Sequence, residues 1–589
     1  MKKTWALLLV LSFLAAIVVG CKPTTGPSAG MEQPTDEGVG ILKNSSATAA
    51  SIINPHEAGT TNDKEILGYT QGQLYRLFPD EEGMNAIIKG ELAEGPPVQV
   101  DEGGRVWQIR VKENAKWENG EPLTADDFIY SWQMLLDPLL LNQYGGTFAE
   151  SFIKISNALA YFRQASSGKS VDWSEVGIKQ LDQHTIEIHT DERNTDWEVM
   201  NHFMQILASP VYKPLYEQWM NDDRTSTLYG TDAEKYMGCG AFILTDWVKE
   251  SLQKYKKNPN YVFKDLIWLA GIETQIVKDA GTRLQMFERG DLHYVGLSAE
   301  ALSKYKEDPR LGEEPSLTVR HIEINMNHPQ QPILGNENFR KALYYAIDRD
   351  TYARVVMMKP APYVMSSRKI ADTTNGIPFR DLDIAKSYLP ENNGYDKELA
   401  KQLFDLAMQE EGLDKVTLTL NYNETRPDTR VVSELMQKDL PAIFGEDRFE
   451  LKLKQLPTSD QLFDAMRSYP NNPSTYELSW AGWGHSAAEF TPWKSFVVYT
   501  STYDRKNAPI YDAELDALYA EVSGEEARFD LDKSIKLTAE LERLVLEHVY
   551  EIPVYEQTNR TLISDRLELQ TKRWMSSVGY GFRYAKIVE

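Results

Sequence analysis

Hydrophobic and polar residues alternate in several short stretches of the chain, and this period-two pattern predicts half-buried β-strands. The first clear stretch is at residues 107–111, where Trp, Ile and Val alternate with Gln and Arg. The same alternation returns at 416–422 and 449–453, and a further strand is predicted at 476–480. The spacing between these strands leaves room for helices, so a mixed α and β protein is predicted.

Two longer stretches carry the helical period instead. Thr124 and Asp127 have capping-box spacing before an apolar stripe that ends at Asp137-Pro138. Residues 336–350 predict a second helix, with Arg340 and Lys341 lying off its apolar stripe. The apolar stripes consist of Phe128, Trp132, Leu135 and Leu136 in the first helix and of Phe339, Leu343, Ala346 and Ile347 in the second.

Beyond residue 415 the predicted order is strand, helix, strand, helix, strand, with helices at 431–440 and 459–468. This alternation is typical of α/β units. Ligands of open α/β sheets bind beyond the carboxyl ends of the strands. The segments NYNET (421–425) and AGWGHS (481–486) occupy such ends, so both are candidates for a ligand site.

Length and charge narrow the range of functions. A chain of 589 residues is too long for one core, so several domains are expected. The formal net charge is −24, from 87 acidic and 63 basic residues. Nucleic-acid binding needs Lys and Arg to neutralise phosphates, so this charge argues against a nucleic-acid partner.

The N-terminus has the pattern of a secretory signal. Lys2 and Lys3 precede an apolar run, and Val18-Val19-Gly20-Cys21 resembles a bacterial lipobox. We therefore expect residues 1–21 to be a lipoprotein signal peptide, with Cys21 as the lipidated residue. An uncleaved membrane anchor is the alternative, but the apolar run is short for it. Residues 22–42 read as a flexible tether, which places the protein on the outer side of the cell membrane.

The search for catalytic motifs finds none of the common ones: no G-x-S-x-G elbow, no H-E-x-x-H and no Walker A motif occurs. The only cysteine after Cys21 is Cys239, which we expect to be buried and inert. The sequence therefore favours a binding protein over an enzyme, and no cofactor or metal is expected.

Four segments resemble the peptide-binding family of extracellular solute-binding proteins, the capture subunits of ABC importers. They are SIINPHEA (51–58), the stretch 114–138, the stretch 238–262, and 321–350 with its ending AIDRD. The resemblance runs from about residue 50 to the C-terminus. It implies an α/β, two-lobed periplasmic-binding-protein-like fold with mixed sheets, an additional subdomain and a ligand cleft between the lobes.

The resemblance also implies where the domains divide. Lobe I would consist of residues 43–75, 205–319 and 556–589, its additional subdomain of 76–204, and lobe II of 320–555. Closure of the lobes would bury the ligand between them. The partners would be an oligopeptide ligand and separate permease and ATPase subunits, and the protein itself would be a monomer.

The implied ligand site centres on the run Ala481-Gly482-Trp483. In relatives an acidic residue three positions after the tryptophan grips the peptide's amino group, but here that position is Ser486. Glu489 could take over this role if the loop bends differently. The full set of candidate ligand-binding residues is Tyr422, Asn423, Arg467, Gly482, Trp483, Gly484, His485, Ser486 and Glu489.

The missing acid leaves the ligand open. It is a longer peptide whose terminus lies elsewhere, an N-blocked peptide, or a non-peptide solute such as a nickel chelate or a sugar. A peptide-sensing receptor would have the same sequence features, and a surface enzyme would need convergent acids with perturbed pKa values in the cleft.

Overall fold

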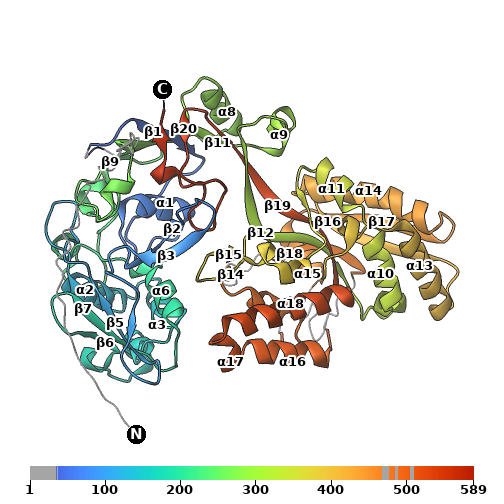
Figure 1. The fold of residues 1–589 in the computed structure, drawn as a ribbon, viewed down its shortest axis with the longest axis horizontal. Coiled ribbons are helices and arrows are strands. Elements are labelled where there is room, and N and C mark those ends of the chain that lie inside the picture. Colours follow the sequence, from blue (N-terminus) through green and yellow to red (C-terminus); the bar gives the residue numbers. More distant parts are fainter. Residues whose placement is uncertain (1–34, 36, 467–475, 484–488, 504–509, 589) are drawn as a thin grey trace, which may run out of the picture.

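The computed structural model describes residues 35, 37–466, 476–483, 489–503 and 510–588. Figure 1 shows two lobes joined by a pair of long strands. The first lobe holds strands β1–β10 and also the C-terminal strands β20 and β21, and the second lobe holds strands β13–β18 with helices α10–α18. The architecture is mixed α and β with several sheets, as predicted.

The first lobe contains two larger sheets and a hairpin. One sheet has the order β1 (Ile41–Ser46), β10 (Gly271–Ile276), β9 (Leu252–Lys257) and β8 (Phe242–Val248). The other has the order β4 (Val98–Gln99), β5 (Val106–Arg110), β7 (Thr185–His189) and β6 (Ile178–Gln180). β2 (Tyr75–Pro79) pairs with β3 (Ala86–Gly90), and β20 (Leu567–Glu568) with β21 (Lys586–Ile587).

The predicted elements of the first lobe are confirmed. Strand β5 covers residues 107–110 of the predicted segment, and its Trp107 and Ile109 are buried. Helix α2 (Ala125–Leu135) begins with the expected capping box, in which the backbone N–H of Thr124 donates to the Asp127 carboxylate at 2.8 Å. Its apolar stripe is fully buried in the core beside β5 and β7.

The central sheet extends from the second lobe across to the first. Its order is β11 (Tyr294–Gly296), β19 (Glu551–Ile563), β12 (Leu311–Ile324), β18 (Leu478–Trp483), β16 (Val416–Asn423) and β17 (Phe449–Leu456), and β13 (Lys359–Pro360) pairs with β19. β16 runs parallel to β17 and to β18, which confirms the predicted α/β alternation. The helices between these strands are α14 (Pro427–Phe444) and α15 (Ser459–Met466).

The other helices are α1 (Thr61–Thr70), α3 (Gly145–Ala149), α4 (Ala158–Phe162), α5 (Gln164–Ser167), α6 (Asp196–Phe203), α7 (Lys213–Gln218), α8 (Ala280–Glu288), α9 (Ala299–Tyr305), α10 (Glu337–Ala346), α11 (Arg349–Val355), α12 (Asp383–Lys386), α13 (Lys397–Glu411), α16 (Ala513–Val522), α17 (Glu525–Arg528) and α18 (Leu531–Glu547). Among the described residues, no helix is both long and apolar enough to cross a membrane.

Cys239 is a buried free thiol, and burial raises its pKa well above the ordinary value.

The prediction of one helix over 336–350 is wrong at its end. Helix α10 stops at Ala346, because Ile347 is extended and Asp348 caps a new helix, α11. The Asp348 side chain accepts from the backbone N–H of Thr351 at 3.0 Å. A capping carboxylate so close to the end of the stripe favours a second N-terminus over continuation.

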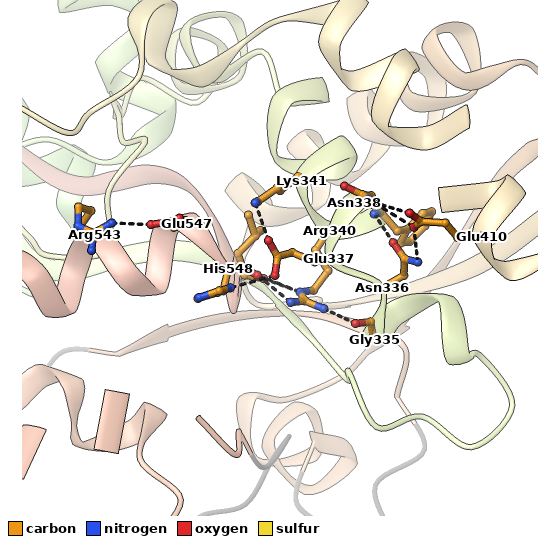
Figure 2. Close-up of polar contacts among 12 residues, drawn as sticks. Gly335, Asn336, Glu337, Asn338, Arg340, Lys341, Glu410, Arg543, Glu547 and His548 are labelled. Atoms are coloured by element: carbon orange, nitrogen blue, oxygen red, sulfur yellow. Dashed lines mark hydrogen bonds and ion pairs between the residues drawn. The ribbon is translucent and has the colours of Figure 1, made fainter. Parts of the chain in front are cut away.

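Arg340, expected off the apolar stripe, is buried, with 5% of its surface exposed. Its guanidinium donates to the backbone carbonyls of Gly335 (2.6 Å), His548 (2.8 and 3.1 Å) and Val549 (3.1 Å) (Figure 2). The carbonyls of His548 and Val549 follow the C-terminus of α18, where backbone acceptors lack helical partners, and that of Gly335 precedes α10. Arg340 therefore fastens α18 to α10 and has a structural role.

We expect Arg340→Met to lower the free energy of unfolding of the second lobe by about 3 kcal/mol, since it leaves several buried carbonyls without donors. Lys341→Met is the matched control. Lys341 only pairs with partly exposed Glu337 at 2.6 Å, and such surface pairs contribute about 0.5 kcal/mol. Urea-induced unfolding measures both losses, and equal losses in the two variants would contradict the structural role of Arg340.

His202 on α6 is fully buried against the rings of Phe148 and Phe203. Its Nδ1 is hydrogen-bonded to the hydroxyl of Ser151 at 3.1 Å. Burial lowers the pKa of His202 from 6.5 to about 3, because the charged imidazolium cannot be hydrated there. Between these two pH values only the unfolded chain takes up the proton, so stability is complete above pH 6.5 and is lost as the pH falls through this window.

We expect His202 to account for about 2–3 kcal/mol of the stability that the protein loses between pH 7 and pH 4.5. His202→Gln should therefore show a smaller loss over this range than the wild type, even if it is less stable at pH 7. Urea-induced unfolding at the two pH values gives the comparison, in which the other titrating groups are common to both proteins. Parallel losses would show that His202 is not linked to acid unfolding.

Candidate ligand-binding site

The two lobes meet at the crossing strands β12 and β19 (Figure 1). These strands are antiparallel, and their pairing runs from Leu311 opposite Leu562 to Glu323 opposite Glu551. The register shifts between Pro315 and Val319, so the ladder is interrupted near the middle of β12. A strand pair that bends at an irregular point is suited to act as a hinge.

A cavity of about 260 Å³ lies beside this crossing and is lined by both lobes. The first lobe contributes the turn between β2 and β3 and the C-terminal residues 573–576. The second lobe contributes residues 367–368 and the hairpin of β14 (Ile370–Asp372) and β15 (Ile377–Pro378). At the tip of this hairpin a Cβ on Gly376, which has φ +67°, would lie 2.1 Å from the carbonyl oxygen of Ala86.

The cavity wall is charged, and its charges are paired across the lobes. Arg573 of the first lobe bonds to the Asp381 carboxylate of the second at 2.8 Å. The same guanidinium donates to the carbonyl of Met84 (2.6 Å) and to the side chain of Asn85 (2.9 Å). The contacts with Met84 and Asn85 hold Arg573 within the first lobe, and its pair with Asp381 couples that lobe to the second.

Glu489 belongs to a second set of contacts at this wall. Its carboxylate pairs with Arg368 Nε at 2.7 Å and accepts from the hydroxyl of Ser576. The Arg368 guanidinium also lies over the ring of Trp574, 4.9 Å from its centre. Glu489 therefore lies where the lobes meet, and its Oε1 accepts from both Arg368 and Ser576.

Tyr422 and Asn423 lie at the carboxyl end of β16, as predicted, and both are buried. The Tyr422 hydroxyl donates to Gln455 on β17 at 3.0 Å. The Asn423 amide donates to Ser459 at 2.6 Å, and its oxygen accepts from the backbone N–H of Thr425 at 2.8 Å. Both side chains thus have partners within the second lobe.

Gly482 and Trp483 lie on β18, opposite Arg320 and Val319 of β12. A Cβ added to Gly482 would lie 2.7 Å from Arg320 Nη1 and 2.7 Å from Thr318 Cγ2. In the structure this glycine makes room for the Arg320 side chain. Trp480, two residues earlier, is core: it is buried and its indole N–H donates to the Ser433 hydroxyl at 2.7 Å.

The remaining candidates cannot be placed. Arg467, Gly484, His485, Ser486 and the lipidation candidate Cys21 lie outside the described residues.

The structure adds a buried polar cluster that the sequence pattern did not reveal. His321 on β12 lies 3.2 Å from Glu551 on β19. Burial lowers the pKa of His321 to about 3 and raises the pKa of Glu551 to about 8, so both are neutral at pH 7. Lys369 lines a second, smaller cavity together with His321 and Glu551, and burial lowers its pKa to about 8.

A second missed feature is a pair of arginines, Arg320 and Arg426, at the carboxyl edge of the central sheet. No local pattern signals this pair, because Arg320 lies on β12 opposite Gly482 of β18, and Arg426 reaches the same place from the loop after β16.

Comparison with known proteins agrees with this architecture. The family model of the bacterial extracellular solute-binding proteins, family 5, matches residues 88–506. The dipeptide-binding protein DppE of Bacillus subtilis is 27% identical over 457 residues, which cover 76% of each chain.

Two solved structures share the fold. The murein tripeptide-binding protein MppA in its unliganded open form has a TM-score of 0.71 at 21% identity, over 93% of this chain and 97% of that one. OppA of Listeria monocytogenes bound to peptide has a TM-score of 0.56 at 22% identity, over 93% and 99%. With a family model that covers most of its length and with this two-lobed fold, the chain belongs to the bacterial extracellular solute-binding proteins of family 5.

Proposed function

We propose that this protein is the substrate-binding subunit of an ABC importer and that it captures oligopeptides between its lobes. The observation that carries the proposal is the cavity at the β12–β19 crossing, which both lobes line. Membership of family 5 and the peptide-binding names of the matched relatives support the same function. Capture by enclosure needs no catalysis, so the protein acts as a binding protein and passes its ligand to a separate permease.

Lobe closure is the mechanism we propose for capture. The higher TM-score with an open unliganded form than with a peptide-bound form supports lobes that close further on ligand. Two contacts already join the lobes at a distance from the crossing strands. Arg528 of α17 pairs with Glu198 of α6 at 2.5 Å, and the Arg193 guanidinium lies 3.8 Å from the centre of the Phe529 ring.

We further propose that the protein works as a monomer tethered outside the cell membrane by a lipid on Cys21. The lipobox-like residues 18–21 and the polar, Pro- and Gly-rich stretch after them support this anchor. A tether of this kind keeps the binding protein near the permease and leaves the lobes free to move.

The state of the ligand's amino terminus distinguishes the alternatives. Ser486 stands where relatives carry an acid, and the Glu489 carboxylate already has Arg368 as its partner. Both observations favour a ligand without a free amine at this position: a longer peptide, an N-blocked peptide or a non-peptide solute.

The ligand itself is the most direct test. We expect peptides of mixed sequence to be released when the mature protein, purified from its own host, is denatured and the extract is analysed by mass spectrometry. The same extract from a protein first unfolded and refolded in peptide-free buffer is the control. A single non-peptide species in place of peptides would contradict the proposed function.

A substitution tests the amino-terminal register. We expect Ser486→Asp to favour peptides with a free amino terminus over their N-acetylated forms by tenfold or more, because a charge-assisted hydrogen bond contributes about 1.5–3 kcal/mol. Ser486→Asn, of the same size but without charge, is the matched control. Competition between the two peptide forms, read by mass spectrometry, gives the ratio. An unchanged ratio in the Asp variant would place the ligand's amino terminus away from residue 486.

A further inference from the structure

The two lobes also touch at a distance from the crossing strands, between the loop that leads into α6 and helix α17. Helix α6 belongs to the first lobe and α17 to the second, and Figure 1 shows them on the facing sides of the two lobes. The residues that meet are Arg193, Asn194 and Glu198 on the first lobe and Glu525, Arg528 and Phe529 on the second. We call this set the α6–α17 contact.

Arg528 of the second lobe donates to two acceptors of the first. Its Nε donates to Glu198 Oε1 at 2.5 Å, and its Nη2 donates to Asn194 Oδ1 at 3.1 Å. Only 29% of the Arg528 side chain and 16% of the Glu198 side chain are exposed. A planar guanidinium that spans two acceptors is held in direction as well as in distance, so this contact fixes how the two lobes face each other.

The first lobe holds both acceptors in place by hydrogen bonds of its own. Glu198 is residue N3 of α6, and its second oxygen accepts from the backbone N–H of Thr195 at 2.9 Å in the capping box. Asn194 is buried, and its amide donates to Thr190 Oγ1 at 2.8 Å and to the carbonyl of Glu192 at 2.7 Å. The two acceptors are therefore set before the lobes meet, and little conformational entropy is lost when they do.

A second arginine reaches in the opposite direction, from the first lobe to the second. The Arg193 guanidinium lies 3.8 Å from the centre of the Phe529 ring, and its Nη1 lies 3.7 Å from Glu525 Oε1. The Arg528 guanidinium lies 5.9 Å from the centre of the same ring. Each lobe therefore supplies one arginine and also the groups that bind the arginine of the other lobe.

The exposure of these groups shows that the contact is reversible. Arg380 and Glu542, an ion pair inside the second lobe, are 6% and 0% exposed, and a pair of that kind is broken only at high cost. The Arg528 pair is partly exposed, and the side chains of Arg193 and Glu525 are 50% and 68% exposed. Water and salt reach such groups, so the contact can open without leaving a buried charge unpaired, and it weakens as the ionic strength rises.

We propose that the α6–α17 contact is an electrostatic latch, which holds the lobes together in the absence of ligand and releases them as the ionic strength rises. The inference rests on the lobe movement proposed above, and it assigns a role to the part of the first lobe that carries β4–β7 and α6. Since this contact lies at a distance from the hinge, a small rotation of the lobes separates its groups fully. The latch is therefore either formed or broken, and its free energy sets the ratio of closed to open molecules.

The test measures the positions of the lobes in the mature protein, unfolded and refolded to remove bound ligand. Spin labels are attached at two exposed positions, through Lys116→Cys in the first lobe and Glu514→Cys in the second. Cys21→Ser leaves these two as the reactive thiols, because Cys239 is buried. Double electron–electron resonance then gives the distances between the labels at about 0.01 M and about 1 M NaCl, where the Debye length is about 30 Å and about 3 Å.

We expect the labelled protein with an intact latch to be mainly closed at low salt and to open at high salt. Arg528→Gln should lower the ratio of closed to open molecules at low salt about threefold, and Arg528→Gln combined with Arg193→Gln about tenfold, with little response to salt left. Arg543→Gln is the matched control. Arg543 pairs with Glu540 and Glu547 of its own helix, so its loss removes one charge from the second lobe and should keep the ratio unchanged.

The same measurement separates the latch from the lobe movement on which it rests. Peptides released from protein purified from its own host are added to each labelled protein. If they shift the distances while salt and both latch variants leave the ratio unchanged, the latch is overturned and the lobe movement stands. If one distance persists in every protein, with and without these peptides, the lobe movement fails and the latch fails with it.

Discussion

The antiparallel pairing of β12 and β19 is the constraint on which the rest of the molecule depends. The strands are 14 and 13 residues long, and they carry the chain out of the first lobe and back. Their ladder is interrupted between Pro315 and Val319, beside the cavity that both lobes line. A continuous ladder would hold the lobes at one angle, whereas an interrupted one holds them together and still permits bending.

A buried carboxylate fixes the cavity wall of the second lobe to this strand pair. Glu556 of β19 is fully buried and accepts from the hydroxyls of Tyr363, Ser366 and Ser367 at 2.8–2.9 Å. A buried charge is stable only when such donors surround it. Because these donors lie in the segment that leads to the β14–β15 hairpin, the hairpin keeps its position relative to the hinge.

Charge is distributed unevenly along the site. At the cavity the ion pairs Arg573–Asp381 and Arg368–Glu489 are complete, so this region contributes shape and coupling between the lobes. At the edge of the sheet Arg426 pairs with Asp428, and Arg320 and Arg426 both donate to Gln557.

The amino-acid pattern by itself determined the local elements: the strands at 107–111 and 416–422, the cap of α2 and the parallel α/β units, because period and capping depend on neighbours in sequence. It also carried the family resemblance and the position of the candidate loops at strand ends. Only the tertiary structure decided that Arg340 is buried, that Gly482 accommodates Arg320, and that Arg426 donates to the same Gln557 oxygen as Arg320. Those facts depend on contacts between residues that are a hundred or more positions apart, such as Arg320 with Gln557, and burial by a distant segment leaves no local period to read.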